Sequence, residues 1–246
     1  MELTIAITTF SKRFDYVSNL IPQIRFFSDA PIMVIINGEK DGKLNDDYIK
    51  NMLSLCSKYN QIYPVFLQET RGLSKLWNTA IVNSFYDNVL LLNDDIEIQS
   101  QDIFEFCDFI TNSNTFSGMC KINGSFSHFI VNKELMEEIG FFDERLMGFG
   151  EEDGDISYRL LKVGKDIGNY TVNGVINIVS NVRHEHVKSG IGKYSKFNRD
   201  FIYNEKYKPN LSGNIRGMFD TPMDEVLTNE TQYPYERFFR ENKKNL

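Results

Sequence analysis

Four short runs of apolar, mostly β-branched residues recur in the first hundred residues, and segments with apolar residues at helical spacing separate them. The runs cover 3–9, 32–36, 63–67 and 89–92, and the helices between them are expected over 14–27, 48–59 and 73–85. A spacing of about 25 to 30 residues between such runs is typical of βαβ units, which build a parallel sheet covered by helices. The pattern therefore predicts an α/β fold, a Rossmann-like three-layer sandwich with a mostly parallel central sheet.

After residue 100 this strict alternation ends. Asp102 is a candidate cap for a helix with apolar residues at i, i+3, i+4 and i+7, and 116–131 is rich in Gly, Ser and Phe with short β-prone pieces. These pieces predict a small mixed extension of the sheet. The pattern is completed by a short helix from Asn132 to Gly140, a helix ending near Gly164 and a last strand over 172–179.

Composition and charge exclude several classes of protein. The net charge of −7 argues against nucleic-acid binding, which requires clustered Lys and Arg. No stretch approaches the roughly 18 consecutive apolar residues of a membrane span, and the first residues do not resemble a secretory signal, so a cytoplasmic location is expected. The three cysteines lack metal-ligand spacing and are predicted to be free thiols. No G-x-G-x-x-G follows the first strand, which argues against a nicotinamide cofactor.

Two acidic clusters are the candidate chemistry of this sequence. Asn93, Asp94 and Asp95 follow a buried run at its carboxyl end, where open α/β sheets bind ligands, although Asn and Asp after a strand also simply form turns. Carboxylates at this edge suggest Mn²⁺ or Mg²⁺, and a cation there suggests a diphosphate.

The second cluster, 151–155, opens a helical pattern behind a Gly-Phe-Gly lead. Acidic residues in a first helical turn complement the helix dipole, and Asp155 with Arg159 makes an ordinary i, i+4 pair. Four carboxylates in five residues repel one another, however, and this repulsion favours a general base of raised pKa.

The order of these features resembles the glycosyltransferases of the GT-A fold, particularly family 2. The resemblance spans about residues 3–187 and rests on Thr8-Thr9-Phe10, on Asn93-Asp94-Asp95, on Ile139–Leu146 and on the acidic stretch that ends with Arg159. The segment 148–159 also resembles the β-1,4-galactosyltransferases. The resemblance to the GT-A glycosyltransferases implies a GT-A domain over 1–190 and a C-terminal extension over 191–246. Within the domain it implies a nucleotide-sugar-binding half over about 1–100 and an acceptor-binding half over about 101–190.

In these families a D-x-D type triplet holds the nucleotide ribose and a metal ion. Asn93 stands at its first place and Asp95 at its metal-binding last place, although an amide is a poorer metal neighbour than a carboxylate. Asn37 stands where family 2 usually has an acidic residue that contacts the base, and uridine is still the expected base. The nucleotide-binding residues implied by the resemblance are Thr8, Thr9, Phe10, Asn37, Arg71, Asn93 and Asp94.

On the acceptor side the resemblance makes Asp153 the catalytic base of a one-step inverting displacement. Glu152, just before it, is expected to meet the acceptor. Phe149, with Phe141 and Phe142 beside the cluster, is in position to stack on an acceptor sugar.

Histidine is scarce in this chain, which has three. A lone His is often a structural residue, but in the galactosyltransferase-like pattern a His after the last sheet strand completes the metal site. His184 matches that place best and His186 is the alternative, whereas His128 is assigned to the acceptor-side sheet or its surface. An imidazole, a carboxylate and diphosphate oxygens together favour Mn²⁺ over Ca²⁺.

The function expected from the sequence is therefore the transfer of a sugar from a nucleotide-diphosphate donor, with UDP as the expected nucleotide, to a hydroxyl of a glycan or a lipid-linked sugar. The aromatic and basic tail around 233–244 could touch a membrane surface that bears such an acceptor, or could pack on its own domain. The alternatives are a non-catalytic sugar- or nucleotide-binding protein of the same fold, a nucleotidyltransferase and a retaining transferase.

Overall fold

The computed structural model describes residues 2–39, 42–178 and 191–206. The chain divides into two compact units. Unit 1 comprises Met1–Thr70, Thr79–Leu135 and Ile167–Val182. Unit 2 comprises Arg71–Asn78, Met136–Asp166 and Arg183–Leu246.

Unit 1 is built on a seven-stranded sheet of order β3-β2-β1-β4-β7-β6-β8. Its strands are β1 (Leu3–Phe10), β2 (Ile32–Asn37), β3 (Ile62–Phe66), β4 (Asn88–Asn93), β6 (Met119–Ile122), β7 (Ser125–Asn132) and β8 (Gly168–Tyr170). The first four strands are parallel to one another, β7 is antiparallel to both of its neighbours, and β8 is parallel to β6. The predicted mostly parallel sheet with a small mixed extension is thereby confirmed.

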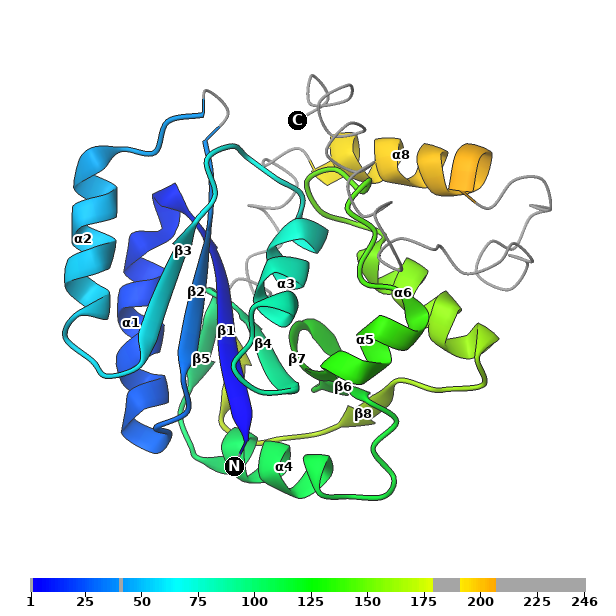
Figure 1. Cartoon of the computed structure of the whole chain (residues 1–246), viewed down its shortest axis with the longest axis horizontal. Helices are drawn as coiled ribbons and strands as arrows, with labels where there is room; N and C mark the ends of the chain where they lie inside the picture. Colours follow the sequence, from blue (N-terminus) through cyan, green and yellow to red (C-terminus); the bar gives the residue numbers. More distant parts are fainter. Residues whose placement is uncertain (1, 40–41, 179–190, 207–246) are drawn as a thin grey trace. The chain divides into compact units, whose positions relative to one another are not determined.

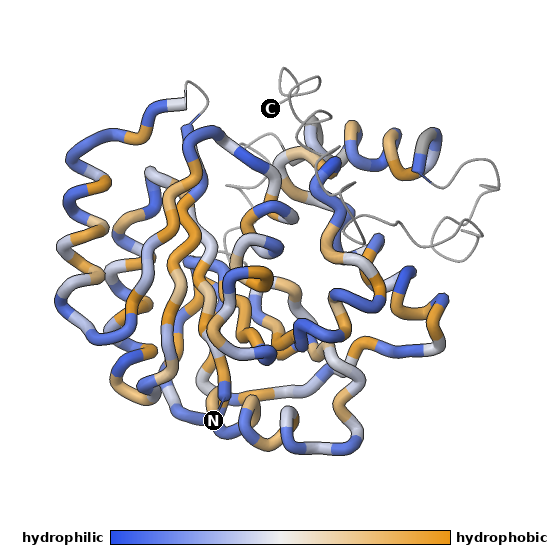
Figure 2. The backbone as a smooth tube through the Cα atoms, viewed as in Figure 1, coloured by the Kyte–Doolittle hydropathy of each residue, from blue (hydrophilic) through white to orange (hydrophobic). Residues whose placement is uncertain are grey.

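Both faces of this sheet are buried, as the continuous apolar sequence of its central strands requires. One face packs against α1 (Phe14–Phe27), α2 (Asp46–Cys56) and α4 (Asp102–Thr111), through a core that includes Ile5, Ile21 and Leu92. Ala6 and Leu91 on the opposite face are equally inaccessible to solvent. The central strands accordingly appear as nearly continuous apolar ribbons, while the helices alternate between apolar and polar residues (Figures 1 and 2).

Strand register brings the carboxyl ends of three strands together at one edge of the sheet. Thr8 of β1 is the partner of Asn93 of β4, and Phe10 is the partner of Asn37 of β2. Immediately beyond this edge, a Cβ on Gly38 would lie 2.5 Å from the backbone at 68–69, so only glycine permits this close approach. After β4 the chain turns into β5 (Ile96–Ile98), which pairs with β9 (Val175–Asn177) in a separate two-stranded sheet.

Unit 2 contains α6 (Glu152–Lys162), α8 (Ile191–Phe201) and a π-helical turn, η2 (Ile202–Lys206). The helices α3 (Leu73–Val82) and α5 (Lys133–Ile139) each contribute residues to both units. Within unit 2, α6 is amphipathic and carries a fully buried arginine, Arg159, which is unusual for the most strongly hydrated class of side chain.

Three local expectations from the sequence were wrong. Asp102 is the first helical residue of α4 and not its cap, because Gln101 stands at that place without a side-chain capping bond. The last strand is shorter than expected, and the pattern did not reveal β8 before it. The helix α8 was missed because most of its residues are polar, although its few apolar residues recur at helical spacing.

Among the described residues no helix is both long and apolar enough to cross a lipid bilayer. The aromatic and basic segment around 233–244, for which membrane contact was considered, lies outside the described residues.

Candidate functional site

The first acidic cluster forms a turn between β4 and β5, here named the acidic turn (Asn93–Asp95). Thr8 donates a hydrogen bond to Asn93 at 3.3 Å, and the Thr9 hydroxyl donates to Asp94 Oδ2 at 2.6 Å. Arg13, the last residue of the 3-10 turn Ser11–Arg13 between β1 and α1, places Nη2 at 3.1 Å from Asp94 Oδ1 and 3.2 Å from Asp95 Oδ2. One guanidinium therefore balances two buried carboxylates.

The two carboxylates of the acidic turn have different surroundings. Burial raises the pKa of Asp94 to about 7, against the opposing effects of Arg13 and Thr9, and both of its oxygens have partners. Asp95 is also buried, and its Oδ1 meets no hydrogen-bond donor in the described part of the chain. Because an unpartnered buried carboxylate oxygen is costly, Oδ1 of Asp95 is the oxygen of the turn that is best suited to bind a further group.

These surroundings fit a divalent cation at Asp95, because hard carboxylate oxygens are its preferred ligands. No group of three or more His, Cys, Asp or Glu side chains suited to a metal ion occurs within the ranges that the structure describes. A cation at this place would thus need further oxygens from its substrate or from water.

The residues predicted to surround the nucleotide in unit 1 are brought together at the carboxyl edge of the sheet. Thr8, Thr9 and Asn37 are buried there, and Phe10 is partly exposed. The Thr9 hydroxyl is already bonded to Asp94, so Thr9 would affect a nucleotide through Asp94 and not by its own hydroxyl.

In unit 2 the second acidic cluster begins α6 and is here named the acidic helix start (Glu151–Asp155). Its lead has positive φ at Gly148 and Gly150, and also at Glu151, the residue before the helix, with φ 75°. A left-handed conformation at a non-glycine residue costs about 1 to 3 kcal/mol and is common at functional sites, where surrounding contacts hold it. Arg199 of α8 supplies such a contact, at 3.1 Å from Glu151.

Glu152 and Asp153 differ sharply in their surroundings. Glu152 is buried, which raises its pKa to about 8, and its Oε2 accepts from Gly150 N at 2.6 Å. Its Oε1 has no partner among the described residues. Asp153 is exposed to solvent, with Oδ1 accepting from Gly154 N at 2.8 Å. The raised pKa expected in this cluster therefore belongs to Glu152, and its main cause is burial, with repulsion between the carboxylates a smaller effect.

Asp155 and Arg159 form the expected i, i+4 pair, but both side chains are buried. Arg159 is 0% exposed, lies 2.9 Å from Asp155 Oδ2, and donates to the carbonyls of Ile139, Gly140 and Phe141. Lys206 Nζ lies 2.8 Å from Asp155 Oδ1. This network anchors the acidic helix start within unit 2.

Asp143 completes the same network. Lys206 Nζ lies 2.6 Å from its Oδ2, and Arg145 binds both of its oxygens. Burial by itself would raise the pKa values of Asp143 and Asp155, but attraction to Lys206 and the neighbouring arginines outweighs burial and holds both values well below their ordinary range. Both groups are therefore structural anions and unsuited to act as general bases.

The helix α8 fixes the loop that leads into α6. The buried Asn198 accepts from Met147 N at 2.7 Å and donates to Met147 O at 3.0 Å and to Gly150 O at 2.8 Å. Tyr194 packs against Phe149, with ring centroids 5.6 Å apart. Three side chains of α8 thus hold the lead of the acidic helix start.

We expect Gly148→Ala to destabilise unit 2, because a Cβ there would lie 2.6 Å from the Tyr194 ring and the residue has φ +60°. The left-handed backbone alone costs about 1 to 2 kcal/mol for a residue with a Cβ. Gly164→Ala is the matched control, since Gly164 has φ +69° and nothing within 4 Å. Chemical denaturation should show a larger loss for Gly148→Ala, and equal losses would show that the Tyr194 contact is unimportant.

The remaining site residues predicted in unit 2 are Arg71 and three phenylalanines, and they differ in burial and in what they contact. Arg71 precedes Gly72, whose Cα packs so closely on Leu146 O that a Cβ would lie 2.3 Å from it, so this segment supports the lead of the acidic helix start. Phe141 and Phe142 are buried and cannot stack on a sugar, which corrects that expectation. Phe149 keeps its position beside the cluster. His184 and His186 lie outside the described residues.

Sequence reasoning did not single out Arg13, and of the two places it gave for His128 the structure shows the first, the sheet. Arg13 lies in Ser11–Arg13, which the sequence suggested only as a poor phosphate loop. His128 is buried in β7 and not at the surface, and burial lowers its pKa to about 4 against the attraction of Asp95. A usable signal was present, because His128 alternates with the inward-facing Ile130 at the strand period of two.

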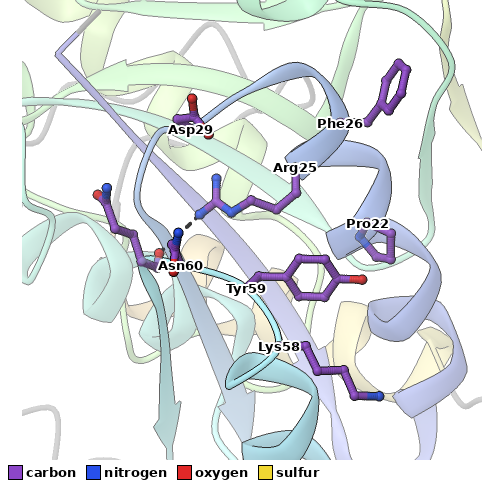
Figure 3. Close-up of a pocket in the computed structure, with 8 residues that line it drawn as sticks. Pro22, Arg25, Phe26, Asp29, Lys58, Tyr59 and Asn60 are labelled. Carbon is purple, nitrogen blue, oxygen red and sulfur yellow. Dashed lines mark hydrogen bonds between the residues drawn. The ribbon is translucent and has the colours of Figure 1, made fainter.

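A cavity of about 720 Å³ lies away from all of these residues, between the end of α1 and the segment before β3 (Figure 3). Arg25 lines this cavity, and its guanidinium donates hydrogen bonds to the carbonyls of Ser28, Ala30 and Gln61. The ring of Phe26 points away from these side chains (Figure 3). These bonds hold the chain around the cavity, and we assign it no function.

No protein-family model matches this sequence, and no curated protein matches it by sequence. Among solved structures, a Pyrobaculum calidifontis mannosyltransferase in complex with GDP-Man and Mn²⁺ superposes with a TM-score of 0.62 at 13% identity, over 81% of this chain and 64% of that one. Glucosyl-3-phosphoglycerate synthase from Mycobacterium tuberculosis, in complex with Mn²⁺, UDP and phosphoglyceric acid, gives 0.59 at 11% identity, over 90% and 87%. TarS from S. aureus gives 0.52 at 14% identity, over 70% and 35%.

This chain therefore spans less than two thirds of the mannosyltransferase and about one third of TarS. At such low identity the likeness concerns the fold. The chain has the GT-A fold, with a mostly parallel seven-stranded sheet and helices on its faces.

Proposed function

We propose that this protein is a metal-dependent, inverting glycosyltransferase that uses a nucleotide-diphosphate sugar, with UDP as the expected nucleotide. The observation that carries the proposal is the buried Oδ1 of Asp95, just after β4, which has no hydrogen-bond partner in the described ranges. Two solved structures of the same fold contain Mn²⁺ together with GDP-Man or UDP, which supports this assignment. The acceptor is a hydroxyl of a glycan or of a lipid-linked sugar.

On the donor side, Asp95 would hold a divalent cation, Mn²⁺ in preference to Mg²⁺, and His184 stays a further predicted ligand. Such a cation neutralises the negative charge that develops on the departing diphosphate. Asn93, with its amide at the start of the turn, would hydrogen-bond a ribose hydroxyl. Phe10 is partly exposed at the same edge and is suited to contact a nucleobase, whereas Thr8 and Asn37 would shape the base site from beneath.

On the acceptor side, we assign the base to Asp153 because it is exposed and therefore accessible to an acceptor hydroxyl. Glu152 has a pKa of about 8, so its carboxyl is mostly protonated at neutral pH and is a poor base there. Glu152 is also buried, so its expected contact with the acceptor stays a prediction.

The reaction is a single displacement. Asp153 removes the proton from the acceptor hydroxyl, and that oxygen forms a bond to the anomeric carbon of the donor sugar. The bond from this carbon to the diphosphate breaks at the same time, and the diphosphate leaves with the electron pair. Attack from the face opposite the leaving group inverts the anomeric configuration.

We expect UDP to raise the melting temperature much more with Mn²⁺ than with a chelator, because the cation would bridge Asp95 and the diphosphate. A ligand at about 100 times its Kd stabilises the folded state by about 2.7 kcal/mol. For a chain of this size that corresponds to a rise of roughly 5 to 10 °C. Differential scanning fluorimetry measures the effect directly.

Asp95→Asn should abolish the Mn²⁺-dependent part of this rise, since an amide binds cations more weakly than a carboxylate. The exposed Asp29→Asn is the matched control and should behave as wild type. Equal stabilisation by UDP in Mn²⁺ and in chelator would rule out the metal assignment.

A further inference from the structure

His128 is a buried histidine that the proposed reaction does not use. It is 3% exposed in β7, and its Nδ1 lies 2.8 Å from the Ser127 hydroxyl. Its other ring nitrogen, Nε2, is sealed from solvent and meets no hydrogen-bond partner in the described part of the chain. A buried polar atom without a partner calls for an explanation, and an unrecorded ion is one of the standard ones.

The fold brings this imidazole toward the acidic turn. His128 is the register partner of Leu92, which lies one residue before the turn begins. After the turn, Ile96 of β5 pairs with Asn177 of β9, and Asn177 Nδ2 donates to the Ser127 hydroxyl at 3.0 Å. The residue after Asp95 is thus linked, through Asn177, to Ser127, the residue before His128.

Within the described part of the chain, an imidazole nitrogen of His128 and a carboxylate oxygen of Asp95 are both buried without a hydrogen-bond partner. Strand register brings the two residues to the same end of the sheet, because His128 is opposite Leu92 and Asp95 follows Leu92 by three residues. A nitrogen and an oxygen that both lack donors or acceptors would be satisfied together by one cation between them.

We propose that His128 Nε2 is a ligand of the divalent cation held by Asp95 Oδ1. This inference rests on the proposed function, because it concerns the same cation. The hydrogen bond at the other ring nitrogen suits this role. A metal-binding histidine normally donates its other N–H to a fixed acceptor, and the Ser127 hydroxyl is placed to accept from His128 Nδ1. An imidazole ligand would also favour Mn²⁺ or Co²⁺ over Mg²⁺ and Ca²⁺.

The test is electron spin-echo envelope modulation of Mn²⁺ bound to the untagged full chain in the presence of UDP, which detects nitrogen coordinated directly to the metal. The chain has three histidines, so the double variant H184A/H186A leaves His128 as its sole imidazole. We expect the histidine nitrogen signal to persist in this variant. This arm leaves the buried His128 untouched, so it does not depend on the folding of a core variant.

The complementary variant is His128→Gln, which keeps much of the side-chain volume. It should weaken Mn²⁺ binding by at least about tenfold, as loss of a ligand or of its support does. Combined with H184A/H186A, it should also remove the histidine nitrogen signal, since no imidazole is then left in the chain. Circular dichroism and the melting temperature check that it is folded.

The outcomes separate the two proposals. Mn²⁺ bound in an Asp95-dependent manner, but without a nitrogen signal from His128, overturns the inference and leaves the proposed function standing. If H184A/H186A no longer binds Mn²⁺, the affinity of His128→Gln decides, and wild-type affinity there overturns the inference. Failure of the wild-type chain to bind Mn²⁺ with UDP would overturn the metal-dependent function itself.

Discussion

Asp153→Asn is expected to lower the turnover of sugar transfer by roughly 10²-fold or more while nucleotide affinity changes little, because the amide cannot accept the acceptor's proton. The substitution keeps the size of the side chain and its ability to accept from Gly154 N, so the local fold is preserved. Initial rates with a panel of nucleotide sugars, and UDP titration of the same samples, measure the two effects separately.

A carboxylate in the first turn of a helix also stabilises that helix by up to about 1 kcal/mol. Asp46→Asn, in the exposed first turn of α2, makes the same chemical change away from the acidic helix start and should leave turnover unchanged. If a folded Asp153→Asn protein transferred sugar at the wild-type rate, Asp153 would not be the base and Glu152 would be the next candidate. Wild-type protein that binds nucleotide sugar but transfers it to no acceptor would support a binding module.

A product with the anomeric configuration of the donor, assigned by nuclear magnetic resonance, would exclude the single displacement and favour a retaining transferase. The fold assignment would survive that result.

Arg159→Met is expected to be the most destabilising of the substitutions considered, with a loss of about 3 to 5 kcal/mol, because it leaves Asp155 short of a buried partner. The substitution also removes the guanidinium that donates hydrogen bonds to the carbonyls of Ile139, Gly140 and Phe141. Urea denaturation should show a lower midpoint with little change in slope, which identifies a change in stability.

Lys196→Met is the matched control for this loss of a cation. Lys196 forms an i, i+4 pair with Asp200 in α8, but its side chain is 78% exposed. Exposed pairs of this kind contribute about 0.3 to 0.5 kcal/mol, so the midpoint should barely move. Comparable midpoints for the two variants would show that the Arg159 network does not stabilise unit 2.

Apart from the short β5, the strands and helices of the first hundred residues were predictable from local sequence alone. The strands β1, β2 and β4 are apolar runs buried on both faces, whereas the edge strand β3 is partly exposed. The helix α1 begins and ends at the expected residues, Phe14 and Phe27. A capping residue defines the start of a helix more closely than the apolar pattern does. Asn45 accepts from the backbone of Asp47 and Tyr48, which is why α2 begins two residues earlier than its apolar positions indicated.

The partners of the acidic clusters were less predictable, because they depend on contacts between distant residues. Arg13 meets Asp94 only because β1 and β4 are neighbours in the sheet. Asn198 and Lys206 contact residues about 50 to 60 positions earlier from a mostly polar segment, and no spacing rule identifies such contacts. Glu152 is buried and Asp153 is exposed, and this difference depends on the folded chain. It cannot be predicted from two adjacent acidic residues in the sequence.

The buried contact of Lys206 with Asp143 and Asp155 also determines when unit 2 can finish folding during protein synthesis. The strands of unit 1 have all been made once the ribosome has passed Asn177, so that sheet can form while translation continues. The two aspartates, in contrast, lack their shared lysine until residue 206 has emerged from the exit tunnel. The nascent chain therefore completes the sheet of unit 1 first and anchors the acidic helix start afterwards.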